Sequence, residues 1–299
     1  MRTARCRVCG ERVRRDRIGS HMRAVHGKGR QLRVLPLALA IAAIVAVTVA
    51  AILFIRQPAP PGDDGDGPFD PDAVAIQFNT DDGWVIKGTY YREDQSMPVV
   101  VLVAGVGEGR QAFGPLVDEL RAKRYNVLAY DPRGCGESVY QNGNKRVWQD
   151  LFDADFQAGT KDVASARYYA LATFPSAPRV AVIGASLGAN QALASAASDT
   201  APELKALVLL SPGSEYRGIE SHPAVDTLNN RTVRPAILFA ATEGEPNGGG
   251  AVAASLSQSY AGKKSQQILT GSSAHGTVLL TYPSFRTEVI QFLDDSFKP

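Results

Sequence analysis

One serine stands in a sequence that favours a nucleophile. An apolar run over residues 180–183, rich in β-branched side chains, leads into the pattern Gly-x-Ser-x-Gly, formed by Gly184, Ser186 and Gly188, and an alanine-rich helical pattern follows at once. A strand, a sharp turn and a helix in this order project a serine hydroxyl above the edge of a sheet. Glycines permit the close backbone approach that such a turn requires. The pattern predicts a nucleophilic Ser186, and the alternative is an ordinary strand-to-helix turn rich in small residues.

A serine hydroxyl needs an adjacent base, which a third group must orient. After Ser186 the chain has two histidines, His222 and His275. His275 lies in a loop of small residues before the last predicted helix and is the candidate base. His222 precedes a proline between two strands, and we interpret it as structural or as a surface residue.

The elements that must position these residues alternate between apolar strands and helical patterns. Strands are predicted over 73–79, 84–91, 98–104, 126–130, 180–183, 204–210, 236–241 and 265–269, the first two as a hairpin. Helices are predicted over 111–123, 157–173, 187–198, 251–261 and 284–297. Uninterrupted apolar strands that alternate with helices indicate an α/β fold, a doubly wound, mostly parallel sheet covered on both faces. Reactive residues should gather at the carboxyl ends of its strands.

Four segments of the chain are similar to the α/β-hydrolase superfamily, in particular to its serine esterases and dienelactone hydrolases. They are residues 101–107, where the family carries its first oxyanion-hole residue, and 130–138, close to the family's Asp-x-Arg-Gly-x-Gly-x-Ser loop. The serine turn is the third, and the two late strands followed by an acid and a histidine are the fourth. The resemblance covers residues 75–297 and implies the α/β-hydrolase fold.

The resemblance also implies roles for single residues. Ser186, Glu245 and His275 follow the family's order of nucleophile, acid and base. In the family the acid follows a late strand, which here is the one predicted over 236–241, so the candidates are Glu243 and Glu245. Glu245 is favoured because it precedes a proline, as the family's acid often does, although the family more commonly uses aspartate. The base would take the hydroxyl proton of the serine and later activate water.

Two backbone N–H groups, those of Val106 and Leu187, would form the oxyanion hole of such an enzyme. Within the 130–138 loop, Asp131 and Arg133 are expected to hold the loop through hydrogen bonds. Cys135 is expected to take no part in catalysis. The segment 213–234 is the place for a cap, and its shortness predicts a relatively open site.

Charge is distributed unevenly along the 299 residues. The chain carries a net charge of +2, yet residues 1–56 hold 12 of its 32 Lys and Arg and only two of its 30 acidic residues, Glu11 and Asp16. The remainder is therefore acidic, which disfavours nucleic acid as its partner. Three cysteines, Cys6, Cys9 and Cys135, cannot build a disulfide framework.

The basic head, residues 1–33, contains a set of metal-ligand types. Cys6 and Cys9 are followed by His21 and His26, and residues 4–28 resemble a C2H2 zinc finger with a loop one residue shorter than usual. The sequence predicts a structural Zn2+ held by these four residues, and the alternative is an unstructured basic tail. A protein partner, a lipid headgroup or a purely structural role is favoured over nucleic acid for this head.

Residues 34–55 form an uncharged apolar stretch long enough to cross a bilayer as a helix. The basic residues precede it and acidic residues follow it, so the head is predicted to be cytoplasmic and the rest extracytoplasmic. The preceding region is too long, and the apolar core too extended, for a cleavable signal peptide. Residues 56–72, rich in Pro, Gly and Asp, are predicted to be a linker to a hydrolase domain over 73–299.

The sequence thus predicts a serine hydrolase anchored in the cell membrane by a single span. Its substrate would be a small-molecule or lipid-like acyl ester or thioester, cleaved through an acyl-serine intermediate without a catalytic cofactor. Two alternatives stay open. One is an inactive hydrolase-fold sensor or interaction module whose functional end is the zinc finger, and the other is a serine peptidase.

Overall fold

The computed structural model of the chain describes residues 3–5, 12–14, 73–173 and 179–298. The chain divides into two compact units, Met1–Pro58 and Ala59–Pro299. In the first unit, β1 (Thr3–Arg5) pairs with β2 (Arg12–Arg14) in an antiparallel manner, with Ala4 opposite Val13. The second unit contains the sheet and the helices.

Several sequence predictions concern residues outside the described ranges. These are the zinc ligands Cys6, Cys9, His21 and His26, the span over 34–55 and the linker over 56–72. The zinc head and the membrane anchor therefore stay predictions. Within the described ranges, every helix is too short or too polar to cross a membrane.

A ten-stranded sheet forms the centre of the second unit. Its strands follow the order β14-β13-β10-β9-β5-β6-β4-β7-β8, with β3 paired to β4. The pairs from β14 to β6 are all parallel, whereas β4 runs antiparallel to β3, β6 and β7. The predicted mostly parallel sheet is confirmed. The strand bounds are β3 Ala73–Asn79, β4 Trp84–Tyr91, β5 Val99–Val103, β6 Asn126–Tyr130, β7 Tyr140–Gln141, β8 Asn144–Lys145, β9 Val180–Ala185, β10 Leu204–Leu210, β13 Ala236–Thr242 and β14 Lys264–Leu269.

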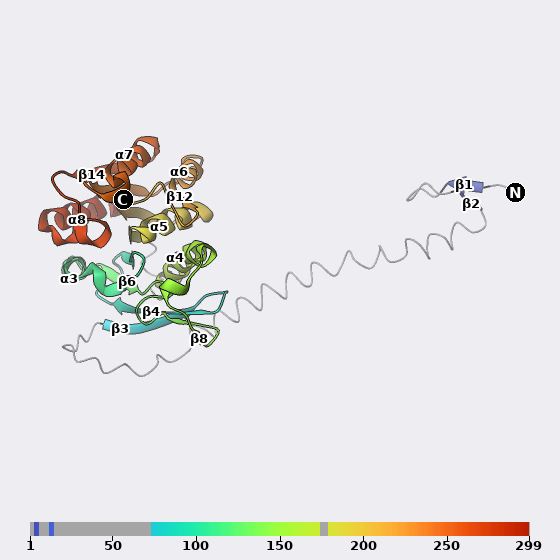
Figure 1. Ribbon diagram of the computed structural model, residues 1–299, viewed down its shortest axis with the longest axis horizontal. Coiled ribbons are helices and arrows are strands. Elements are labelled where there is room, and N and C mark those ends of the chain that lie inside the picture. The colour runs from blue at the N-terminus through green and yellow to red at the C-terminus, as the bar shows by residue number, and fades with distance from the viewer. Residues whose placement is uncertain (1–2, 6–11, 15–72, 174–178, 299) are drawn as a thin grey trace. The chain divides into compact units, whose positions relative to one another are not determined.

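Helices cover both faces of this sheet because its parallel strands are apolar on both sides. Alternate residues of β5 illustrate the division: Val101 joins one hydrophobic core and Leu102 the other. The first core includes side chains of α4, α5, α6 and α7, and the second includes those of α3 and α8 (Figure 1). The helix bounds are α3 Pro115–Ala122, α4 Asp153–Thr173, α5 Leu187–Ser198, α6 Ser221–Asn229, α7 Gly249–Ser259 and α8 Pro283–Phe297.

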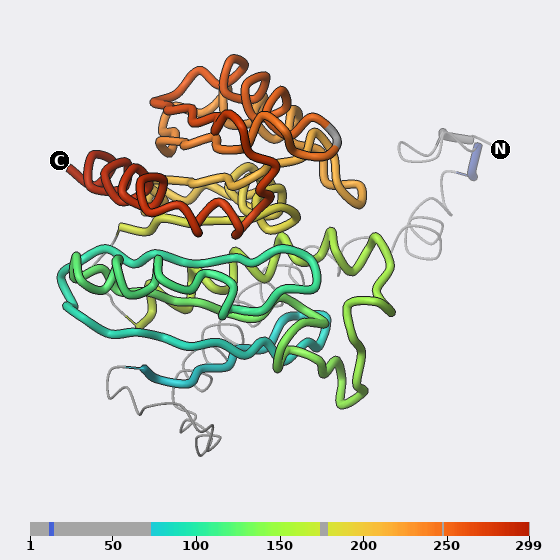
Figure 2. Tube along the Cα trace, turned by 60° about the vertical axis from the view of Figure 1, so that its left-hand side comes forward, coloured from blue at the N-terminus to red at the C-terminus, as the bar shows by residue number. Residues whose placement is uncertain are grey.

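The order of strands separates the early and late parts of the domain. The hairpin of β3 and β4 lies toward one end of the sheet, and the segments after β10 lie toward the other (Figure 2). Between them, β9 is flanked by β5 and β10, and Gly184 and Ala185 at its carboxyl end pair with Val103 and Leu210. Three strand ends therefore meet at the serine turn.

Two predicted helices differ in extent from those observed. The helix predicted over 111–123 consists of the 3-10 helix η4 (Arg110–Phe113) and α3, because Gly114 between them has φ +39°. The helix predicted over 157–173 begins at Asp153, where acidic residues in the first turn favour a helix N-terminus. The predicted cap region contains a short hairpin, β11 (Glu215–Tyr216) and β12 (Ile219–Glu220), followed by α6.

Candidate active site

Ser186 occupies a strained turn between β9 and α5. Its φ of 52° and ψ of −120° are rare for a residue with a side chain. The backbones crowd around it as predicted: a Cβ on Gly184 would lie 2.3 Å from the carbonyl oxygen of Gly188, and one on Gly188 would lie 2.3 Å from that of Val103. The Ser186 N–H donates to Leu210 O at 2.8 Å. Only glycine fits at positions 184 and 188, so the turn holds the hydroxyl above the strand ends.

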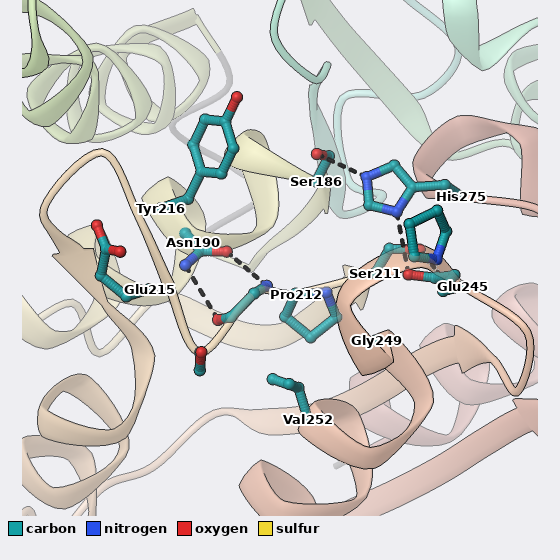
Figure 3. Close-up of a pocket in the computed structure, with 13 residues that line it drawn as sticks. Ser186, Asn190, Ser211, Pro212, Glu215, Tyr216, Glu245, Gly249, Val252 and His275 are labelled. Atoms are coloured by element: carbon teal, nitrogen blue, oxygen red, sulfur yellow. Dashed lines mark hydrogen bonds and ion pairs between the residues drawn. The ribbon is translucent and has the colours of Figure 1, made fainter.

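A chain of hydrogen bonds joins Ser186 to His275 and Glu245 (Figure 3). The distance between Ser186 Oγ and His275 Nε2 is 2.8 Å, and His275 Nδ1 lies 3.0 Å from Glu245 Oε2. These residues are 89 and 30 positions apart in the sequence, respectively. With an N–H at Nδ1 facing the carboxylate, Nε2 is left as an acceptor for the serine proton.

Glu245, rather than Glu243, is the acid that reaches His275. Its side chain is 1% exposed, and Oε1 accepts hydrogen bonds from Ser211 Oγ at 2.6 Å and from the Thr242 N–H at 2.9 Å. Helix α7 leaves room for this carboxylate, because a Cβ on Gly249 would lie 2.1 Å from Oε2. Glu243 is exposed on the same loop.

The pKa values of the two partners move in opposite directions. Burial raises the pKa of Glu245, but hydrogen bonds from His275, Ser211 and Thr242 outweigh burial and leave it below its ordinary value. The hydrogen bond to Glu245 raises the pKa of His275; burial opposes this, and the charges of Glu245 and Glu108 add to the increase. The carboxylate is thus kept ionised, and it stabilises a protonated imidazole.

Ser211 is a residue of the site that the sequence analysis missed. It follows β10 with φ 55°, is 2% exposed, and its hydroxyl donates to Glu245 while accepting from the Gly276 N–H at 2.8 Å. It therefore connects the acid to the loop that bears His275. A polar residue at the carboxyl end of a buried strand, before Pro212, was the available signal.

Asn190 was also missed, and it fixes a wall of the pocket. It lies in the first turns of α5, 1% exposed, and its Nδ2 donates to Gly213 O and Ile219 O, both at 3.1 Å. Its Oδ1 accepts from the Gly213 N–H at 2.9 Å. A polar side chain on the buried face of an alanine-rich helix was the signal in the sequence. Asn190 thus attaches the β11–β12 excursion to the helix that follows the nucleophile.

A cavity of about 180 Å³ opens beside Ser186. Its walls come from α5, from the excursion over 211–216 and from the segment over 245–252, with His275 at one side (Figure 3). Glu215, Tyr216 and Val252 are among its lining residues, and none of the described residues that line it is a lysine or an arginine. The cavity is therefore small and, among the described residues that line it, offers no cationic side chain to a negatively charged group.

Of the two residues predicted for the oxyanion hole, Leu187 follows the serine in the chain and Val106 belongs to the loop after β5. Leu187 is the first residue of α5, where helix N–H groups lack an intrahelical partner. Val106 follows Gly105, whose Cα faces Ser186 so closely that a Cβ there would lie 3.3 Å from Ser186 Cβ. Both backbones are thus adjacent to the hydroxyl.

The loop after β6 is held by ion pairs, as the sequence analysis expected. Buried Asp131 accepts from the N–H and guanidinium of Arg110, at 2.7 and 2.6 Å. Arg133 is 3% exposed and pairs with Asp162 at 2.6 Å and Asp82 at 2.8 Å. Through these contacts, the side chains of Asp131 and Arg133 hold the loop against neighbouring segments of the domain.

The remaining sequence candidates have other surroundings. Cys135 is 4% exposed, and burial raises the pKa of its thiol to about 11, so it is a thiol and not a nucleophilic thiolate at neutral pH. His222 lies in α6, and its Nε2 is 3.1 Å from Ser255 Oγ of α7. In the described part of the chain, no cluster of three or more His, Cys, Asp or Glu side chains could hold a metal ion.

Solved structures share this architecture. An esterase of Pyrococcus furiosus has a TM-score of 0.61 at 17% identity, with 78% of this chain and 97% of that chain covered. A carboxyl esterase of Bacillus coagulans has a TM-score of 0.57 at 16% identity, over 75% of this chain and 98% of that one. A dienelactone hydrolase of Anabaena variabilis has a TM-score of 0.56 at 16% identity, covering 75% of this chain and 96% of its own.

The domain has the α/β-hydrolase fold. The family described as serine aminopeptidase, S33, matches residues 94–240 of this chain, a range that includes Ser186 and ends before Glu245 and His275. An uncharacterized protein of Salmonella typhi, YfhR, is 28% identical over 134 residues, which are 43% of this chain and 42% of that protein. The chain therefore matches less than half the length of this curated relative. The family match and the esterase folds support a hydrolase.

Proposed function

We propose that this chain is a serine hydrolase that cleaves carboxylic esters or thioesters through an acyl-Ser186 intermediate. The observation that carries the proposal is the hydrogen-bonded chain from Ser186 through His275 to Glu245. A hydroxyl, an imidazole and an ionised carboxylate in this arrangement are the parts that acyl transfer requires. The strained turn and the close approach of Gly105 to Ser186 support the same proposal.

In the first half of the proposed reaction, Ser186 Oγ attacks the substrate carbonyl while His275 Nε2 takes its proton. The oxyanion of the tetrahedral intermediate accepts hydrogen bonds from the N–H groups of Val106 and Leu187. Collapse of the intermediate breaks the bond to the leaving group, and His275 returns the proton to it. Glu245 stays ionised and stabilises the imidazolium.

In the second half, water attacks the acyl-serine carbonyl and gives its proton to His275 Nε2. The second tetrahedral intermediate is held by the same two N–H groups. Its collapse releases the carboxylic acid, and the proton on His275 goes back to Ser186 Oγ. The enzyme is thereby restored.

Substrate size and charge provide a test of this proposal. The cavity of about 180 Å³ is smaller than the roughly 300–1,000 Å³ of drug-sized ligand sites. We therefore expect kcat/KM for p-nitrophenyl acetate and butyrate to exceed that for the decanoate by at least about tenfold, since a pocket rejects groups it cannot hold. The kcat/KM for p-nitrophenyl valerate, whose five-carbon acyl group is neutral, should exceed that for p-nitrophenyl hemisuccinate, whose four-carbon acyl group carries a negative charge. Equal or faster hydrolysis of the decanoate would contradict the assignment of this cavity to the acyl group.

A serine peptidase is the second candidate, favoured by the match to the serine aminopeptidase family. The exposed carboxylate of Glu215 in the pocket lining would suit the amine of an amino-terminal residue. Aminoacyl p-nitroanilides separate the two candidates. Hydrolysis of alanyl p-nitroanilide with a larger kcat/KM than that of p-nitrophenyl acetate would favour the peptidase.

We further propose that residues 34–55 anchor the enzyme in the cell membrane with the hydrolase domain outside. The charge difference across this stretch supports this orientation. A membrane-impermeant fluorophosphonate probe should label the full-length chain on intact cells, and the Ser186→Ala variant should stay unlabelled. Labelling of the parent chain only after lysis would contradict the orientation without contradicting the serine chemistry.

A further inference from the structure

Glu108 connects the two loops that flank Ser186. Its Oε2 accepts a hydrogen bond from the Gly105 N–H at 3.0 Å, and its Oε1 accepts one from Thr277 Oγ1 at 3.0 Å. Glu108 and Thr277 are 169 positions apart in the sequence. One partly buried carboxylate thus joins the loop after β5 to the 3-10 helix η7 (Gly276–Thr281).

Each loop carries a proposed part of the catalytic machinery. Gly105 precedes Val106, whose N–H would bind the oxyanion, and Thr277 lies two residues after His275. Thr277 is 6% exposed and immediately follows Gly276, whose N–H is already fixed by Ser211. The loop that bears His275 (the histidine loop) is therefore held from two sides. Ser211 bonds it beside Glu245, and Glu108 joins it to the loop of Gly105 and Val106 (the oxyanion loop).

The negative charge of Glu108 also raises the pKa of His275. The carboxylates that raise the pKa of His275 are Glu245, from the loop after β13, and Glu108, from the loop after β5. Glu245 has the larger effect because it accepts the hydrogen bond from Nδ1. A glutamine at position 108 could bond the same two partners, accepting from the Gly105 N–H and donating to the Thr277 hydroxyl in the reverse direction, so the negative charge is the property that only the glutamate supplies.

We propose that Glu108 is a positioning residue that holds the oxyanion loop and the histidine loop at a fixed spacing across Ser186, and that its charge favours the imidazolium formed during acyl transfer. This inference rests on the proposed serine-hydrolase function. The hydroxyl of Thr277 and the N–H of Gly105 supply the hydrogen bonds, and the carboxylate supplies the charge. Glu108 itself contacts no reacting atom in this mechanism.

Two substitutions separate the two roles in the full-length chain. In Glu108→Ala, both hydrogen bonds are lost, and we expect kcat for p-nitrophenyl acetate to fall by about 10- to 100-fold with KM changed by less than about threefold, because small misalignments of reacting groups are costly. In Glu108→Gln, the amide oxygen can accept from Gly105 and the amide N–H can donate to Thr277. This variant should recover kcat to within about fivefold of the parent above the acid limb of the pH profile.

The pH profile of Glu108→Gln is the decisive measurement. Loss of a negative charge near His275 lowers the pKa of the imidazole, so the acid limb of kcat/KM should move to lower pH by at least about 0.3 pH unit. The rate at which a fluorophosphonate probe labels Ser186, followed across the same pH range, should show the same movement without depending on the true substrate. Glu288→Gln removes an equal charge from the exposed side of α8 and serves as the control whose profile matches the parent.

The outcomes of these experiments distinguish the role proposed for Glu108 from the proposed serine-hydrolase function. A kcat within twofold of the parent in Glu108→Ala would overturn the positioning role, as would a Glu108→Gln variant as slow as Glu108→Ala. An unmoved acid limb in Glu108→Gln would overturn the electrostatic role. A parent chain that neither hydrolyses esters nor reacts with the probe would instead overturn the proposed function. If Glu108→Ala does not fold, Glu108→Gln still tests the charge.

Discussion

Replacement of Ser186 by alanine will lower kcat/KM for p-nitrophenyl acetate by at least about 10³-fold, because the variant has no oxygen to form the acyl intermediate. The substitution removes one atom, Oγ, and leaves His275 and the glycines of the turn in place. Substrate binding should therefore change far less than turnover. Steady-state kinetics of the parent and the variant, together with mass spectrometry of the fluorophosphonate adduct, measure both consequences.

Ser198→Ala is the matched control for this experiment. Ser198 is the last residue of α5, and its hydroxyl donates to Ser195 O at 2.9 Å within the same helix. Its activity should stay within about twofold of the parent, as is usual for substitutions outside a site. Hydrolysis by Ser186→Ala at the parental rate would refute the serine mechanism. A parent chain inactive on every acyl ester and amide would favour the sensor or interaction module instead.

Replacement of Glu245 by glutamine is expected to lower kcat by about 10³- to 10⁴-fold, whereas Glu243→Gln should have less than about a twofold effect. Glutamine has the shape of glutamate, but an amide beside Nδ1 can favour the wrong imidazole tautomer and does not stabilise the imidazolium. The Glu245 carboxylate lies 3.0 Å from His275 Nδ1, and the exposed Glu243 has no such contact with His275 among the described residues. The pair of variants therefore decides between the two acids that the sequence offered.

The sign of the pH effect gives this prediction a second readout. Glu245 raises the pKa of His275 above its ordinary value of 6.5, and the histidine must be neutral to act as a base. The parent should thus lose activity as the pH falls through a value above 6.5. In Glu245→Gln, the residual activity should persist to lower pH. A large loss in Glu243→Gln with little loss in Glu245→Gln would assign the acid to Glu243.

The sequence was sufficient to predict those structural elements that depend on residues close together in the chain. Strands such as Val99–Val103 and Val180–Ala185 are continuous runs of apolar residues, which a sheet covered on both faces requires. The turn at Ser186 could likewise be predicted, since its Gly-x-Ser-x-Gly pattern spans five residues. Gly184 is required by the backbone of Gly188 within the turn, whereas Gly188 is required by the Val103 carbonyl oxygen of a neighbouring strand. The resemblance to the α/β-hydrolase superfamily, through its residue order, also implied that the histidine after the last strand could contact this turn.

The ends of helices, and contacts between residues far apart in the chain, were harder to predict from the sequence. The helix predicted over 111–123 is broken at Gly114, because a positive φ at one glycine depends on how the chain packs onto the sheet and not on the helical pattern around it. Glu245 was favoured over Glu243 only by the proline that follows it, for a similar reason. Glu243 and Glu245 lie two residues apart on one loop, so both satisfy the same sequence order.

By itself, then, the sequence determined the alternation of strands and helices and the Gly-x-Ser-x-Gly pattern of the serine turn, because each depends on residues close together in the chain. His275, 89 positions from Ser186, was predicted from the residue order of the family that the chain resembles. The tertiary structure decided which glutamate turns inward, since the space beside Gly249 and the hydroxyl of Ser211 become available to Glu245 only after β10, β13 and α7 have packed together. It also brought Glu108 to Thr277. Contacts across such sequence separations follow from the parallel strand order, which gathers the carboxyl ends of distant strands at one edge of the sheet.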